Sequence, residues 1–221
     1  MRRGICAFIA LSYAIAYAQG VHPITGRPYA SVMSANGADW LTRPEREEEE
    51  YPDQALDEIG VAKGSAVADI GAGSGAITWR LAKRVGPTGK VYAVDIQPRM
   101  IELLRQNMAQ RRITNVETVL SSVYDPTLPP ASVDLELMID VYHEFSHPQE
   151  MLRHLRAALK PGGRMVLLEY RGEDPNVPIR PEHKMTVAMV KAEVEPEGFY
   201  LDKEIESLPR QHILIFTVSA D

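Results

Sequence analysis

From Ser65 onward, short apolar runs alternate with longer segments in which apolar residues recur every three or four positions. The short runs are rich in β-branched residues and predict strands at 66–70, 90–94, 116–120, 133–139 and 164–170. The longer segments predict helices at 75–85, 98–110 and 148–159. Such alternation is typical of a parallel sheet that is covered by helices on both faces.

The C-terminal part departs from this alternation. A helix is predicted at 182–195, closed by Pro196, and two β-rich runs follow at 199–206 and 212–218. The turn between these runs, at 208–210, is too short for a parallel crossover, so the two strands should pair antiparallel. The sequence therefore predicts a doubly wound α/β fold with a mostly parallel seven-stranded sheet and a C-terminal antiparallel hairpin.

The segment before the alternating region divides into an arm and a helical start. Residues 19–41 contain a stretch rich in proline and glycine and are expected to form an extended N-terminal arm, followed by one domain at 42–221. Thr42, with Pro44 in the first turn, predicts a helix start, and a second helix should run from 52 to 59. The acidic run at 47–50 is expected to be a solvated helix face, with contact to a positively charged ligand as the alternative.

The first residues have the three parts of a secretory leader. Arg2 and Arg3 precede an apolar stretch at 4–18, which ends in Ala16-Tyr17-Ala18. We therefore expect residues 1–18 to be a signal peptide and the mature protein to be periplasmic or secreted, without stable membrane insertion. An uncleaved anchor or a buried helix is the alternative. Cys6, the single cysteine, lies in this stretch, so the mature chain would have neither disulfides nor thiolate chemistry.

The net charge of the chain limits the classes of molecule that it is expected to bind. The chain of 221 residues has a net charge of −6 and no basic stripe, which argues against a nucleic-acid partner. We expect a monomer or homodimer that acts on a small molecule.

The most informative motif is the run VADIGAGSGAIT at 67–78. Gly71, Gly73 and Gly75 follow a strand and precede a helix, so backbone amides can approach a ligand without an intervening Cβ. Asp95 ends the next strand, where a carboxylate can accept hydrogen bonds from both ribose hydroxyls. Asp69, ahead of the glycines, suggests a cofactor with an amino group near the turn, which favours S-adenosylmethionine over a dinucleotide.

This layout resembles the class I S-adenosylmethionine-dependent methyltransferases, in particular the small single-domain UbiE-like (type 11) enzymes. The resemblance begins near Trp40 and includes the Lys160-Pro161-Gly162-Gly163 turn before the fifth strand and the closing hairpin. It implies methyl transfer from S-adenosylmethionine to a small-molecule acceptor. The cofactor-binding residues that it implies, together with those from the motif, are Asp69, Gly71, Ala72, Gly73, Gly75, Asp95, Ile96, Ser122, Val123 and Asp140. Ser122 departs from the aspartate that family members often have there.

Two other functions compete with this interpretation. The run GAGSGA at 71–76 also satisfies the dinucleotide fingerprint, so an NAD-binding oxidoreductase is an alternative. Residues 143–147 spell H-E-x-x-H, the signature of zinc hydrolases, in which His143 and His147 share a helical face. Pro148 follows directly and disfavours a helix there, so we predict no metal at this motif. A binding protein that has lost catalysis is a third alternative.

The loop after the fourth strand is the best candidate for acceptor chemistry. His143 has an ordinary pKa suited to a general base, although a histidine that only shapes the pocket is an equal alternative. Glu169, at the end of the fifth strand, is the second catalytic candidate because α/β sheets bind ligands at the carboxyl ends of their strands. The sequence also leaves open a metal cluster of His22, His143, His183 and His212.

Overall fold

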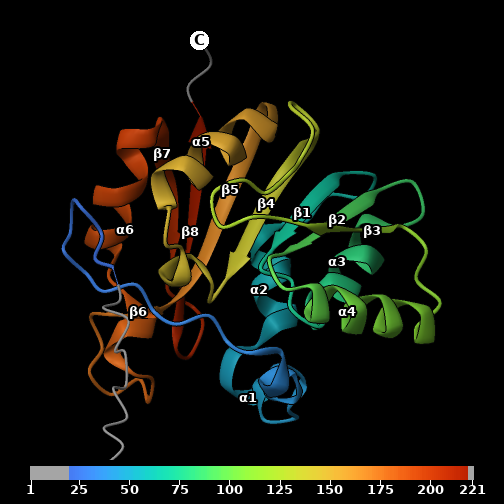
Figure 1. Ribbon diagram of the computed structural model, residues 1–221, viewed down its shortest axis with the longest axis horizontal. Coiled ribbons are helices and arrows are strands. Elements are labelled where there is room, and N and C mark those ends of the chain that lie inside the picture. The colour runs from blue at the N-terminus through green and yellow to red at the C-terminus, as the bar shows by residue number, and fades with distance from the viewer. Residues whose placement is uncertain (1–19, 219–221) are drawn as a thin grey trace, which may run out of the picture.

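The computed structural model describes residues 20–218, and its centre is one twisted sheet with the strand order β3-β2-β1-β4-β5-β8-β7 (Figure 1). The neighbours from β3 to β5 are parallel, whereas β8 pairs antiparallel with both β5 and β7. A short strand, β6, pairs with β5 off this path. The strands are β1 (Ala66–Ile70), β2 (Lys90–Asp95), β3 (Val116–Leu120), β4 (Val133–Ile139), β5 (Leu159–Arg171), β6 (Lys184–Met185), β7 (Phe199–Ile205) and β8 (Gln211–Val218). The predicted fold class is confirmed.

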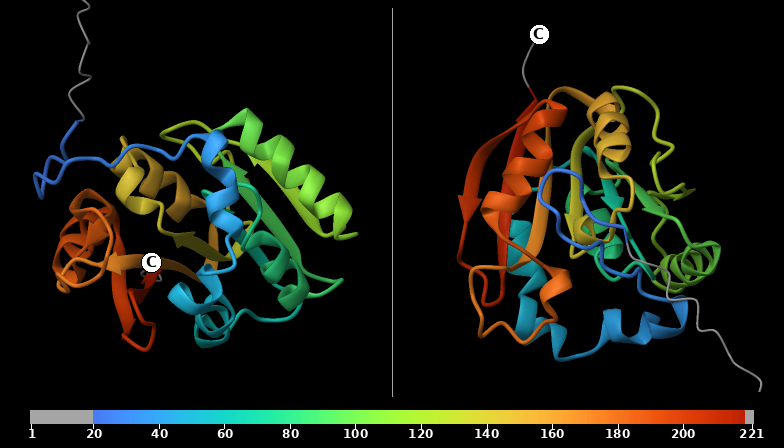
Figure 2. Two further views of the ribbon diagram at one scale, coloured as in Figure 1. Left: turned by 90° about the horizontal axis from the view of Figure 1, so that it is seen from below. Right: turned by 60° about the vertical axis from the view of Figure 1, so that its left-hand side comes forward.

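Helices cover both faces of the sheet (Figure 2). They are α1 (Arg46–Glu50), α2 (Pro52–Ile59), α3 (Thr78–Val85), α4 (Pro98–Gln110), α5 (Pro148–Ala158) and α6 (Val187–Val194). Apolar residues of α5 and α6 pack with Met165 and Leu167 of β5, and those of α2 and α3 pack with Val166 and Leu168. Successive strand residues point to opposite faces, so a strand buried on both sides needs the continuous apolar run seen in the sequence.

Several boundaries differ from the prediction. The helix expected at 75–85 begins at Thr78, because Gly75 has a φ of +88° and belongs to the preceding turn. The helix expected at 182–195 is divided into a 3₁₀ turn, η3 (Pro181–His183), then β6, then α6. Thr186 causes the late start of α6, since its side chain accepts a hydrogen bond from the Met189 amide and caps the helix.

The N-terminal segment is more structured than an extended arm. Residues Ala35–Thr42 form a 3₁₀ helix, η1, so Thr42 ends one helical segment instead of starting another. The next helix, α1, begins at Arg46, and its acidic run is only partly solvated because Glu50 is buried against Arg46. The predicted leader at 1–18, with Cys6, lies outside the described residues. Within 20–218, no helix has the length and apolar character needed to cross a membrane.

Candidate cofactor cleft and adjoining histidine cluster

The turn between β1 and α3 brings backbone to the carboxyl edge of the sheet. Gly71, Gly73 and Gly75 have φ values of +73°, +55° and +88°, in the left-handed region that favours glycine. A Cβ on Gly71 would collide with Val141, and one on Gly73 would lie 2.7 Å from Leu41. The chain therefore packs closely around this turn and leaves no room for side chains on it.

Asp95 lies directly beside the glycine turn. One of its carboxylate oxygens accepts the Gly73 amide at 2.9 Å, and the other accepts the Gln97 amide at 2.8 Å. Burial raises the pKa of the Asp95 carboxyl, while these amides lower it. Each oxygen keeps a further acceptor position, so the carboxylate can still receive hydroxyl groups from a ligand.

A cleft of about 980 Å³, including its opening to solvent, lies above the ends of β1, β2 and β4. Six of the ten predicted cofactor residues line it: Gly71, Gly73, Asp95, Ile96, Val123 and Asp140. The other four, Asp69, Ala72, Gly75 and Ser122, do not. Ser122 instead accepts the Asp125 amide at 3.0 Å, and its neighbour Ser121 faces the cleft.

Asp69 supports the turn from below. It is buried and accepts a hydrogen bond of 2.6 Å from the Thr78 hydroxyl at the start of α3. Burial raises the pKa of its carboxyl to about 6, against the opposing effect of the Thr78 hydrogen bond. Asp69 therefore connects β1 to α3 and makes no part of the cleft wall.

The N-terminal segment closes over the cleft, which the sequence did not predict. Val32, Met33, Trp40 and Leu41 all line it. The Gln97 side-chain amide donates to the Met33 carbonyl at 2.9 Å and ties this segment to the start of α4. Nothing in the composition of the segment marks these four residues, because their role depends on where the arm is held.

Asp140 forms an acidic part of the wall. It has a φ of +53°, and its carboxylate accepts the Gln211 side-chain amide from β8 at 2.7 and 2.9 Å. Burial and the nearby carboxylates of Glu50 and Glu169 raise the pKa of Asp140 well above its ordinary value. A positively charged ligand group would stabilise the ionised Asp140 carboxylate, so this part of the wall favours a cation.

The two predicted catalytic residues lie together behind this wall. Glu169 is fully buried, accepts the Tyr142 amide at 2.9 Å and lies 2.5 Å from Nδ1 of His143. Burial alone would lower the pKa of His143, but the Glu169 carboxylate raises it overall. Neither residue lines the cleft, whereas the next residue, Glu144, does.

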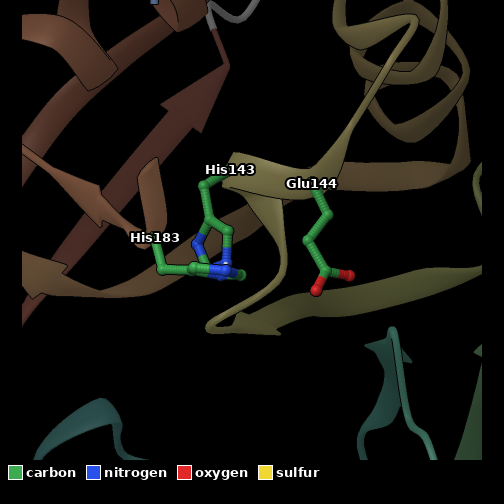
Figure 3. Close-up of side chains that lie close together, drawn as sticks. All are labelled: His143, Glu144 and His183. Carbon is green, nitrogen blue, oxygen red and sulfur yellow. The ribbon is translucent and has the colours of Figure 1, made fainter. Parts of the chain in front are cut away.

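Glu144 and His183 lie beside this pair, although the sequence predicted neither of them as a site residue. The Nε2 atom of His143 lies 3.0 Å from Nδ1 of His183, which comes from η3 after β5 (Figure 3). Burial raises the pKa of Glu144 to about 7, while the charge of His143 lowers it. Only the fold reveals this group, since 40 positions separate the two histidines.

The H-E-x-x-H motif does not form a zinc-hydrolase helix. Its first residues form a single 3₁₀ turn, η2 (Tyr142–Glu144), and His147 is exposed with Nδ1 at 3.0 Å from the Ser146 hydroxyl. His22 and His212 lie elsewhere, buried near Glu193 and Glu206. Of the four histidines considered from the sequence, only His143 and His183 come together.

The parallel sheet with its antiparallel β5-β8-β7 end, and a cleft at the carboxyl edge of that sheet, match the methyltransferase fold. A family model described as "Methyltransferase domain" matches residues 62–208, and the chain belongs to that family. The NAD-binding and zinc-hydrolase alternatives find no support.

Individual relatives agree with this assignment. The chain is 32% identical over 112 residues to the ubiquinone/menaquinone biosynthesis C-methyltransferase UbiE of Ectopseudomonas mendocina, covering 50% of this chain and 44% of that protein. It thus spans less than half the length of this curated relative. A solved structure of a SAM-dependent methyltransferase from Aquifex aeolicus is 26% identical, with a TM-score of 0.80, and the match covers 85% of this chain and all (100%) of that one. A type 11 methyltransferase structure from Sulfolobus solfataricus shares the fold at 21% identity, with a TM-score of 0.64 over 78% of this chain and 95% of that one.

Proposed function

We propose that this protein transfers a methyl group from S-adenosylmethionine to a small-molecule acceptor. The observation that carries the proposal is the cleft between the glycine turn and Asp95, whose wall also contains Asp140 and Glu144. Carboxylates there complement a cofactor that has both a sulfonium and an ammonium group. Arg46 also lines the cleft and supplies a partner for the cofactor's carboxylate.

Each wall residue has a distinct part in this proposal. Asp95 accepts the ribose hydroxyls, Ile96 and Val123 contact the adenine ring, and the Gly71–Gly73 backbone approaches the amino-acid end together with Asp140. Bound there, the cofactor supplies an electrophilic methyl group. The protein's task is then alignment and exclusion of water, because in-line displacement at carbon needs no covalent help from the enzyme.

His143 and Glu169 remain the proposed catalytic pair, but neither side chain lines the cleft. Glu169 holds the His143 ring through Nδ1, and Glu144, the next residue along the chain, lines the cleft. His143 therefore acts on an acceptor indirectly, through the neighbouring side chains, and we treat Glu169 as its positioning residue.

The proposed acceptor is a small molecule, and the protein acts as a monomer or homodimer without nucleic acid. The UbiE relatives are named as C-methyltransferases of quinone biosynthesis. Quinol-like and phenolic acceptors therefore belong in the first panel, beside amines and thiols. Tritiated methyl from the cofactor should move to at least one of them, and Gly71→Ala should give only background. Equal labelling by wild type and variant would contradict the proposal.

We also propose that the protein is exported. The charged, apolar and small-residue parts of residues 1–18 support cleavage after Ala18. N-terminal analysis of envelope-fraction protein should find a chain that begins at Gln19. Intact Met1 in a soluble cytoplasmic pool would contradict this.

A further inference from the structure

His143, Glu144 and His183 bring metal-ligand atoms together at one point. The first two belong to η2, which follows β4, and the third belongs to η3, which follows β5. Because β4 and β5 are adjacent and parallel, the segments after them meet at the same edge of the sheet. One ligand atom from each of the three side chains lies within 4.8 Å of the other two (Figure 3).

Glu169 prepares His143 for such a role. Its carboxylate lies 2.5 Å from Nδ1 of His143 and is itself held by the Tyr142 amide. A proton on Nδ1 leaves Nε2 as the free lone pair, directed at His183. A buried carboxylate behind a histidine is the usual arrangement behind a metal-bound imidazole, since it fixes the tautomer and the ring orientation.

We propose that His143, Glu144 and His183 bind a divalent first-row transition-metal ion. Two imidazoles and one carboxylate favour Mn²⁺, Fe²⁺, Co²⁺, Ni²⁺ or Zn²⁺ over Ca²⁺ and Mg²⁺, which prefer oxygen ligands alone. The two facing nitrogens are 3.0 Å apart. At metal–nitrogen distances of about 2.1 Å they would subtend roughly a right angle, as adjacent ligands of an octahedral ion do.

Three protein ligands leave coordination positions open. Glu144 belongs both to the cluster and to the cleft wall, so an open position would face a molecule bound in the cleft. An oxygen or nitrogen of the methyl acceptor is the group that such an ion would hold and make easier to deprotonate. This last step rests on the proposed function, whereas metal binding itself does not.

The site differs from the one that the H-E-x-x-H motif suggests. That motif would use His147, which is exposed and bonded to Ser146. The proposed site uses His183 in its place, which the motif does not contain. His147→Ala is therefore a matched control, because it removes a neighbouring histidine from outside the cluster.

The test is a calorimetric titration of full-length protein without a histidine tag, first stripped by chelator, with Mn²⁺, Co²⁺ and Zn²⁺. We expect one equivalent of binding for wild type and for His147→Ala, and at least a tenfold loss of affinity for His183→Ala and Glu144→Gln. The visible absorption of bound Co²⁺ should change in His183→Ala, because a nitrogen ligand is lost. Circular dichroism confirms that each variant is folded.

Two results would overturn the proposal. One is the absence of stoichiometric binding to folded wild-type protein, which would make the cluster a hydrogen-bonded chain only. The other is binding that survives His183→Ala or disappears in His147→Ala. Because these measurements use the metal alone, they are independent of whether methyl transfer is found.

Discussion

Asp69 and Asp95 end or nearly end neighbouring strands, yet the protein uses the two carboxyl groups differently. Both are buried, but Asp95 lines the cleft, whereas Asp69 bonds to Thr78 beneath the glycine turn. Their positions at the ends of strands predict that both lie near the cofactor, and spacing alone does not distinguish a residue that contacts the ligand from one that supports the turn. Successive side chains of a strand point to opposite faces, so a shift of one residue reverses the direction of a carboxylate. Only the three-dimensional structure of the turn therefore shows which carboxylate faces the ligand.

Asp69 should make stability depend on pH. Burial raises the pKa of its carboxyl from the ordinary value of 3.8 to about 6 in the folded state, so the folded protein holds this proton more tightly. The resulting stabilisation is complete below about pH 4 and is lost as pH rises to about 6. As pH rises between these limits, the free energy of unfolding of Asp69→Asn should therefore increase by roughly 2–3 kcal/mol relative to that of wild type. Urea unfolding at pH 4 and pH 7 measures this, and a difference independent of pH would contradict it.

Asp95 should instead control cofactor affinity. Asp95→Ala removes a charged acceptor from the cleft and should weaken S-adenosylmethionine binding by about 1.5–3 kcal/mol. The exposed Glu117→Ala on the neighbouring strand serves as the control and should bind as wild type does. Isothermal titration calorimetry compares the three proteins, and an unchanged affinity for Asp95→Ala would remove this residue from the site.

The helices and strands that can be predicted from the sequence are those that a short stretch of the chain specifies by itself. The β1–turn–α3 unit was predictable because apolar residues and glycines specify it within a few positions. The segment 182–195 was not, since β6 forms there only by pairing with β5 and interrupts a helical pattern. Tertiary contacts can override local preference in this way. The wall residues of the N-terminal segment were missed for the same reason.

Alanine substitutions at two glycines separate the effect of a steric clash in the turn from the effect of backbone strain. Gly71→Ala should lower stability and abolish cofactor binding, because its Cβ would collide with Val141 at a positive φ. Gly162→Ala has a similar φ of +78° but no atom within 4 Å of the added carbon. The control should therefore lose a little stability, about 1 kcal/mol, and keep its affinity. Titration and thermal unfolding measure both, and equal affinities for the two variants would refute the turn's role.

At the scale of the whole molecule, the cleft depends on an N-terminal segment that α6 holds in place. Arg27 donates to both carboxylate oxygens of Glu193 at 2.8–3.1 Å and also to the His143 carbonyl at 2.9 Å. Both members of this ion pair are buried. More than 160 positions separate Arg27 from Glu193, and the wall residues Met33 and Leu41 lie downstream of it. The sequence could not show such a distant connection, although it showed both charges.

Loss of this ion pair should destabilise the protein and expose the segment over the cleft. Arg27→Ala leaves the buried Glu193 carboxylate without its guanidinium partner, and breaking a buried ion pair in this way typically costs about 3–5 kcal/mol. Arg99→Ala removes an exposed pair with Glu102 and should unfold at the wild-type urea concentration. Limited proteolysis should also cleave residues 31–42 faster in Arg27→Ala. Equal unfolding midpoints and cleavage rates would show that the ion pair does not hold the segment.

Titration of full-length protein with S-adenosylmethionine and, separately, with NAD⁺ decides which of the two cofactors the cleft binds. The carboxylate-lined cleft predicts saturable binding of one S-adenosylmethionine per chain and no comparable heat from NAD⁺. Failure of S-adenosylmethionine to bind folded protein, or tighter binding of NAD⁺, would rule out the proposed cofactor.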